Sequence, residues 1–208
     1  MRRALALVVA LSAALVVGTA SPSFAAVTCA ETHNNETLAG PVTVPAGAFC
    51  VLNGTQVTGN ISVGAGGMVR VINGSKVSGS IVTTGGGIQV YASSVGGSVQ
   101  AQGPVGFAPY YPFVLCESTF NSTVSVLSAP GGVFHDEIRI GDSAFSDCDG
   151  GNHIRGNLTA SNNTVNDVHF VIKNNTVGGN LTCQNNTPPP DTANNTVTGA
   201  TIGQCNTV

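Results

Sequence analysis

The sequence predicts an all-β fold, a single-stranded parallel β-helix solenoid with a right-handed coil of about 20 residues, stapled by disulfides. Three observations predict it: phrases that recur at one interval, short runs of alternating apolar residues, and six cysteines whose spacing follows the same interval. The repeat is the most direct of the three, because self-similarity at a period near 20 residues is typical of solenoids.

The repeat is clearest as an apolar residue followed two positions later by glycine. In the tail, NNTVGGNLTC begins at Asn174 and NNTVTGATIG begins at Asn194. The same step occurs along the whole chain, at Val57/Gly59, Val77/Gly79, Val95/Gly97, Ile154/Gly156, Val177/Gly179 and Val197/Gly199. The long interval between the third and fourth of these steps indicates insertions into otherwise regular coils.

Each coil is expected to contain short strands. In MVRVINGSKVSGSIVTTGGG, which starts at Met68, apolar residues alternate over short runs that Asn, Gly or Ser interrupt. Such runs are typical of strands, and glycine with β-branched residues disfavours a helix. One coil then holds three strands, each stacked about 4.8 Å from its counterpart in the next coil. Asn and Gly suit the corners, because they adopt the left-handed conformation that sharp turns require.

The cysteines follow the coil period. Cys29 and Cys50 are 21 positions apart, and Cys183 and Cys205 are 22 apart, so one coil separates the members of each pair. Equivalent Cα atoms in adjacent coils lie about 5 Å apart, which a disulfide accepts. The remaining two fit one coil with an insertion. Fifteen pairings are formally open, and we predict the nearest-neighbour scheme, with bridges between Cys29 and Cys50, Cys116 and Cys148, and Cys183 and Cys205.

Residues 1–26 have the pattern of a secretory signal peptide. Arg2 and Arg3 precede an apolar run that ends at Val17, and small residues around Ala25 form a cleavage site. We therefore expect a secreted, extracellular protein with one β-helix domain at 27–208, carrying irregular insertions near 103–114 and 134–153. No other stretch is apolar over the roughly 18 residues that a membrane span needs.

The charge balance restricts the partners. Without the two arginines of the leader, five basic residues stand against ten acidic ones, which gives a net charge of −5. Proteins that bind nucleic acid or anionic membrane surfaces need a higher density of Lys and Arg to neutralise phosphate groups. We expect no nucleic-acid partner and no membrane span.

An acidic segment from His135 to His153 interrupts the repeat, holds five of the ten acids, and is expected to project as a loop. Asp142, Asp147 and Asp149 are candidate ligands for Ca²⁺, which prefers carboxylate and carbonyl oxygens. No other cofactor is expected. The pattern departs from an EF-hand loop, because Gly151 stands where the third ligand would be. Two alternatives stay open: a solvated loop held down by Cys148, and a general acid and base acting on a glycosidic bond.

An aromatic segment, GPVGFAPYYPF, runs from Gly103 to Phe113. Phe107, Tyr110 and Tyr111 are candidates for stacking on a sugar ring or for holding an extended peptide. The alternative is that this segment folds back and covers an apolar ladder.

The tail from Asn174 to Cys205, with VPAGAFCVLNGTQVTGNISV near the start, resembles the repeats of small exported actinobacterial β-helix proteins. More distantly, the coil resembles the pectate-lyase-like superfamily of right-handed β-helices. The first resemblance implies an architecture and brings no catalytic residues with it. The recognisable catalytic signatures of the second are absent from this sequence.

Two classes of function follow. The preferred one is a secreted, non-enzymatic β-helix protein with a structural, adhesive or glycan-binding role, which presents Asn, Thr and Ser faces to cell-wall or extracellular polysaccharide or to other copies of itself. The alternative is a carbohydrate-active enzyme, a polysaccharide lyase or glycoside hydrolase, that uses the acidic loop 135–153. Ice binding through a flat Thr ladder is disfavoured, because Thr does not recur at one fixed position when the coils are aligned by sequence.

Overall fold

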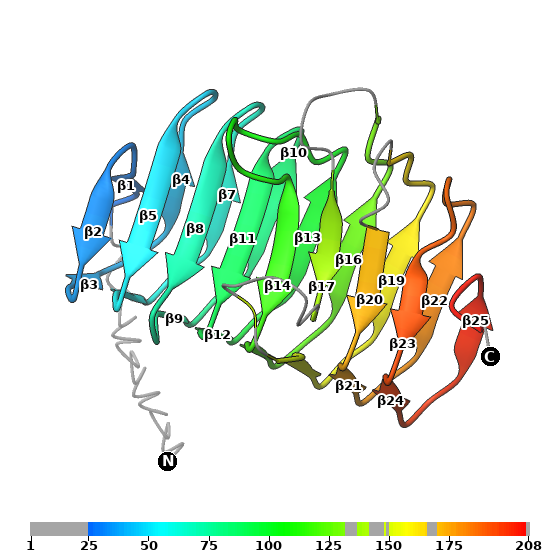
Figure 1. Ribbon diagram of the computed structural model, residues 1–208. Coiled ribbons are helices and arrows are strands. Elements are labelled where there is room, and N and C mark those ends of the chain that lie inside the picture. Colours follow the sequence, from blue (N-terminus) through cyan, green and yellow to red (C-terminus); the bar gives the residue numbers. More distant parts are fainter. Residues whose placement is uncertain (1–24, 132–136, 142–147, 149, 166–169, 207–208) are drawn as a thin grey trace, which may run out of the picture.

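The computed structural model describes residues 25–131, 137–141, 148, 150–165 and 170–206. The described residues form 25 strands in three parallel sheets, here named A, B and C, and the chain visits these sheets in a fixed rotation from β1 to β25 (Figure 1). This arrangement confirms the predicted parallel β-helix.

Sheet A has nine strands and lies behind sheet B in Figure 1. Its strands are β1 (Val27–Thr28), β4 (Val42–Val44), β7 (Ile61–Val63), β10 (Ile81–Thr84), β13 (Val99–Gln102), β16 (Val124–Leu127), β19 (Leu158–Ser161), β22 (Leu181–Gln184) and β25 (Thr201–Gly203).

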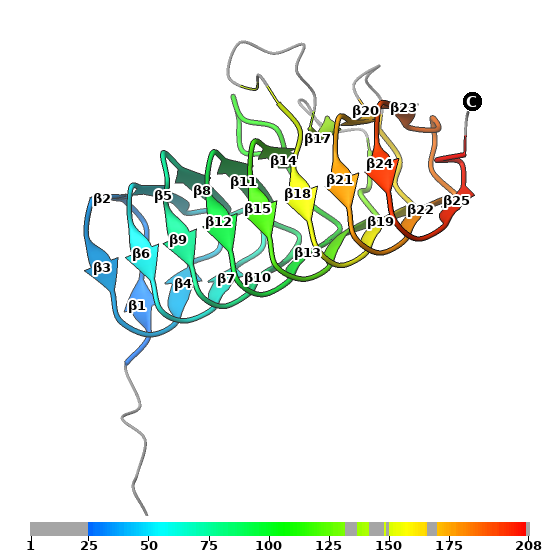
Figure 2. The same cartoon turned by 90° about the horizontal axis from the view of Figure 1, so that it is seen from below.

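Sheets B and C have eight strands each. Sheet B contains β2 (Thr32–Asn34), β5 (Phe49–Asn53), β8 (Met68–Ile72), β11 (Gly87–Tyr91), β14 (Phe113–Cys116), β17 (Ile138–Ile140), β20 (Phe170–Lys173) and β23 (Asp191–Ala193). Sheet C, at the front of Figure 2, contains β3 (Thr37–Leu38), β6 (Gln56–Val57), β9 (Lys76–Val77), β12 (Ser94–Val95), β15 (Thr119–Phe120), β18 (His153–Ile154), β21 (Thr176–Val177) and β24 (Thr196–Val197).

The core is a set of apolar ladders along the axis of the coil. Parallel register places like residues above one another, and alternation within each strand turns every second side chain inward. In sheet A, for example, one inward ladder contains Val42, Ile61, Ile81, Val99, Val124, Leu158 and Leu181, all buried. The intervening positions point outward and form the surface of the rod.

A residue in the left-handed region of backbone conformation follows every strand of sheet B. The residue that follows each of these strands has a positive φ, between 42° and 77°, and therefore turns the chain toward sheet C at the same place in each coil. Asn or Gly occupies most of these positions, as predicted, because both tolerate this conformation. The set is Asn35, Gly54, Asn73, Ala92, Glu117, Gly141, Asn174 and Asn194.

A second ladder runs inside this corner and satisfies its backbone. In five of its members, Ser75, Ser118, Asn152, Asn175 and Asn195, the side chain accepts a hydrogen bond from the backbone N–H of the member one coil earlier. Asn195 Oδ1, for example, accepts from Asn175 at 3.0 Å. The Asn side chains also donate back, so that Asn175 Nδ2 reaches the carbonyl of Ile140 at 2.9 Å. The corner ladder, as we name it, consists of Thr55, Ser75, Ser93, Ser118, Asn152, Asn175 and Asn195.

The three disulfides pair as predicted, with Cα–Cα distances of 5.4, 5.6 and 5.1 Å. Cys29–Cys50 and Cys183–Cys205 lie within the apolar core at the first and last coils. Cys116, by contrast, follows the inward-facing Leu115, so strand alternation turns its side chain to the outside of sheet B. The two terminal bridges therefore close the ends of the core, whereas Cys116–Cys148 holds a chain segment against its surface.

One sequence expectation needs correction. The segment from His135 to His153 was expected to project as a single loop, but β17 lies within it and forms the sixth strand of sheet B. Ile138 and Ile140 are fully buried and pair with β14 and β20. The short alternating run Ile-Arg-Ile is a normal strand of this solenoid, and the charged residues around it obscured that pattern.

Candidate functional site

The aromatic segment lies on the outer face of sheet B. Tyr110 stacks on Phe49 of β5 with ring centroids 4.9 Å apart, and the ring of Phe107 stacks on the same Phe49 at 5.3 Å. Arg70 of β8 places its guanidinium carbon 4.7 Å from the centre of the Tyr110 ring, a cation–π geometry. These contacts hold the segment against the sheet, as expected for a cover.

Tyr111 is held in the same way, farther along the sheet. Its ring lies 5.6 Å from the guanidinium carbon of Arg139, and its carbonyl accepts a hydrogen bond from Gln89 Nε2 at 2.9 Å. The three aromatic candidates, Phe107, Tyr110 and Tyr111, are all half-buried. Stacking of a sugar on Tyr110 or Phe107 would have to compete with the Phe49 ring, and their role in ligand binding stays a prediction.

Of the five acidic residues between His135 and His153, the structure describes one, Glu137. Asp142, Asp147 and Asp149 lie outside the described residues, so the expected calcium site and the expected acid–base pair stay predictions. Glu137 is described; it is buried, and its carboxylate pairs with Arg139 Nη2 at 2.5 Å. Within the described part of the chain, no three His, Cys, Asp or Glu side chains gather where they could hold a metal ion.

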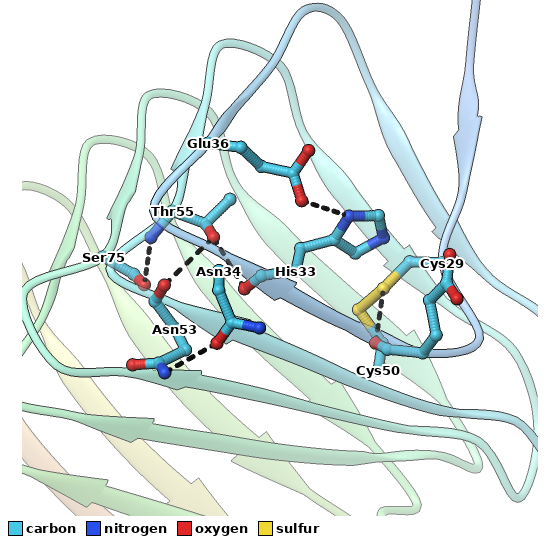
Figure 3. A network of polar contacts seen from close by, with 9 residues as sticks. Cys29, His33, Asn34, Glu36, Cys50, Asn53, Thr55 and Ser75 are labelled. Atoms are coloured by element: carbon cyan, nitrogen blue, oxygen red, sulfur yellow. Dashed lines mark hydrogen bonds and ion pairs between the residues drawn. A yellow bond between two sulfur atoms is a disulfide. The ribbon is translucent and has the colours of Figure 1, made fainter.

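The first coil has a polar network, shown in Figure 3. His33 of β2 points toward the core, at the position that Leu52 occupies in the next coil, and its Nδ1 lies 2.8 Å from Glu36 Oε1. Thr55 links the two coils, since its hydroxyl donates to the carbonyl of His33 at 2.9 Å. Sequence reasoning did not single out this pair, because both residues lie in an ordinary polar run, THNNET.

The outer face of sheet A carries a regular column of uncharged side chains. The central outward position of its strands carries hydroxyl side chains in six of nine strands, and none of the nine is charged. Strands stack about 4.8 Å apart, so this column extends for roughly 40 Å. It contains Thr28, Thr43, Ser62, Val82, Gln100, Ser125, Thr159, Thr182 and Ile202.

This column corrects the expectation that Thr does not recur at one fixed position. Thr28 pairs with Thr43, and Thr159 pairs with Thr182, although Val82 and Gln100 interrupt the row between these two pairs. The sequence alignment missed the column, because insertions make the coils unequal in length. A usable signal was the middle residue of each apolar-x-apolar triplet, such as VTV, ISV and VSV.

Sheet C has a different outer face. Its outward positions include Thr37, Thr119 and Thr176, but also Lys76 and His153 in the same column. The outer face of sheet B is occupied in part by the aromatic segment. Among the three sheets, sheet A is therefore the one whose outward strand residues are all uncharged.

Comparison of the chain with known protein families, with curated proteins and with solved structures finds no match. Within the part of the chain that the structure describes, no helix is long and apolar enough to cross a membrane.

Proposed function

We propose that this protein is a secreted, non-enzymatic binding protein that holds an uncharged polysaccharide of the cell wall or extracellular matrix against the outer face of sheet A. The observation that carries the proposal is the uncharged column on that face, in which six of the nine side chains carry a hydroxyl group. Three disulfides are compatible with an extracellular protein, because such bonds persist in oxidising compartments.

The chemistry of the face favours a neutral partner. Hydroxyl groups both donate and accept hydrogen bonds, as the hydroxyls of a polysaccharide do. A charged polymer would lose water at this surface without meeting an opposite charge, which is unfavourable. Each contact is weak, but a long polymer that engages several of them at once gains avidity from their number.

A rigid surface also lowers the cost of binding. The hydroxyl groups are fixed at one spacing by the parallel hydrogen bonds between strands and by the buried ladders beneath them. Preorganised groups lose little conformational freedom when a ligand binds, so more of the contact energy remains as affinity.

The alternative, a carbohydrate-active enzyme using the acidic loop 135–153, has no comparable observation in its favour. Of the acids in that loop, the structure describes Glu137, and this residue is buried in an ion pair. A buried, paired carboxylate is poorly placed to exchange a proton with a substrate.

The test uses two matched variants of the purified, signal-free protein. Thr159→Asp places a charge in the central outward column of sheet A, on β19, and Thr119→Asp places the same charge at a half-buried outward position of sheet C. Co-sedimentation with insoluble cellulose, chitin and cell-wall glycan is measured for both variants and for wild type. We expect Thr159→Asp to lose binding at least tenfold, and Thr119→Asp to retain it.

If wild type sediments with none of these polymers, or if both variants bind equally well, sheet A is not the binding face. A Tyr110→Ala variant is included as a further comparison. Loss of binding in Tyr110→Ala alone would move the site to the aromatic segment on sheet B.

A further inference from the structure

The outer face of sheet A has a shallow depression where β10, β13 and β16 lie side by side. Its volume is about 170 Å³. Outward residues of the three strands line it in two columns, the first with Val82, Gln100 and Ser125, the second with Thr84, Gln102 and Leu127. Outward neighbours lie about 7 Å apart along a strand and about 5 Å apart across strands. The six side chains therefore cover an area close to that of one pyranose ring.

The chemistry of the lining is mixed in the way a sugar requires. Val82, which is 39% exposed, and Leu127 offer apolar surface at opposite corners of the patch. The amides of Gln100 and Gln102 occupy the middle strand, where Gln100 Nε2 donates to Ser98 Oγ at 3.1 Å. A sugar ring has an apolar face of C–H groups and a rim of hydroxyls, which these two kinds of side chain complement.

We propose that this depression is an anchoring subsite for one ring of a neutral polysaccharide. In this arrangement the C–H face of the ring packs against Val82, Leu127 borders the opposite corner of the patch, and Gln102 with the hydroxyl of Thr84 binds the ring's hydroxyl groups. The inference rests on the proposed function and gives it a location on the face. Charged sugars are disfavoured at the subsite, because none of its eight lining residues carries a charge that could offset the loss of water from a charged group.

The position of exposed apolar side chains supports this location. Among the described residues, Val82 and Ile202 are the two large hydrophobic residues with more than a third of their surface exposed, and both belong to the central column of sheet A. Ile202 lies on the last strand, without amide neighbours on both sides. Val82 lies inside the sheet beside the two glutamines, where apolar contact and hydrogen bonding can act on one ligand.

The experiment compares two glutamine variants. Gln100→Ala/Gln102→Ala removes the amides of the depression, and Gln184→Ala removes an exposed amide from the same outward column on β22. Cellohexaose and chitohexaose are titrated while the methyl NMR signals of Val82 and Leu127 are recorded. We expect shifts of these signals in wild type and in Gln184→Ala, and binding weakened about three- to tenfold in the double variant.

The outcomes separate this inference from the proposed function. If polymer binding by wild type depends on Thr159 but the double variant binds as wild type does, the subsite is wrong and the proposed function stands. If wild type binds no polymer, the proposed function fails, and the hexasaccharide titration then decides the subsite alone. If the methyl signals of Val82 and Leu127 do not shift in wild type, the subsite proposal is overturned. Shifts that occur in wild type and vanish in the double variant support the subsite.

Discussion

Single residues at the corners set the shape of each coil. Where sheet B turns toward sheet C, the chain requires one residue with positive φ in every coil. Asn and Gly adopt positive φ at little energetic cost. Ala92 (φ 42°) and Glu117 (φ 49°) occupy the same corner position, although neither residue type favours positive φ. An L-residue with a Cβ is strained in this conformation by about 1–2 kcal/mol. The repeated geometry of the neighbouring coils holds both residues in place.

Replacing Ala92 with Gly should therefore stabilise the protein. Removal of the Cβ relieves the strain, and the larger entropy of the unfolded glycine chain offsets part of this gain. We expect the free energy of unfolding to rise by about 1 kcal/mol and Tm by about 2–4 °C, measured by thermal and urea denaturation. The matched control is Ala39→Gly, at an exposed residue with negative φ, which should be neutral or destabilising. A less stable Ala92→Gly protein would contradict the strain argument.

The strands show how the ends of the rod are fixed. Among the described residues, β25 pairs with β22 on one side only, so hydrogen bonds from a single neighbouring strand hold it in the sheet. Cys205 compensates, because its bond to Cys183 ties the last turn to the core. Gln204 assists from the surface, where its Oε1 accepts the backbone N–H of Asn186 at 2.8 Å.

The double variant Cys183→Ala/Cys205→Ala should release this end locally. A bridge that closes a loop of 22 residues contributes about 3 kcal/mol in the chain-entropy account. We expect amide hydrogen exchange to lose protection over residues 201–206, while Leu158–Ser161 stays protected. Cys116→Ala/Cys148→Ala serves as the control, since that bridge lies on the outer face of sheet B. Unchanged protection of 201–206 in the first variant would show that the bridge does not hold the last strand.

At the scale of the whole molecule, the first coil differs from the coils that follow. His33 occupies the core column that Leu52 and Val71 continue, and Glu36 stands at the start of the corner ladder, one coil before Thr55. A further coil stacked on the first coil would present a backbone N–H and a backbone carbonyl to Glu36. The Glu36 carboxylate can accept a hydrogen bond from that N–H, but it cannot donate one to that carbonyl. Polar, inward-pointing charged residues are a known means of blocking a sheet edge.

We therefore expect wild type to sediment as a single monomeric species, and the variant His33→Leu/Glu36→Asn to form heavier species as its concentration rises. The substitutions give the first coil the residue types of the later coils, and with them an edge that another copy can extend. Sedimentation velocity measures the effect, and Glu31→Gln, an exposed change in the same coil, is the matched control. A variant that stays monomeric, or a wild type that already associates end to end, would contradict this role of the pair.

The sequence by itself determined the features that depend on one repeated interval. The three-strand coil, the Asn and Gly corners and the two terminal disulfides all join residues one coil apart, so a constant spacing in the chain indicates them. Cys183 and Cys205 are an example, because their separation of 22 residues is itself the geometric information. Cys116 and Cys148 are 32 residues apart, and for this pair the spacing alone left other partners open.

The tertiary structure decided what no constant interval encodes. The insertions between β13 and β18 lengthen two coils by unequal amounts, so only the pairing of strands shows that Thr43, Ser125 and Thr159 share one column. The contact of Tyr110 with Phe49 joins residues from different coils whose spacing follows no repeat. Periodic backbone pairing can be derived from the order of residues, whereas the alignment of surface side chains depends on how many residues each turn consumes.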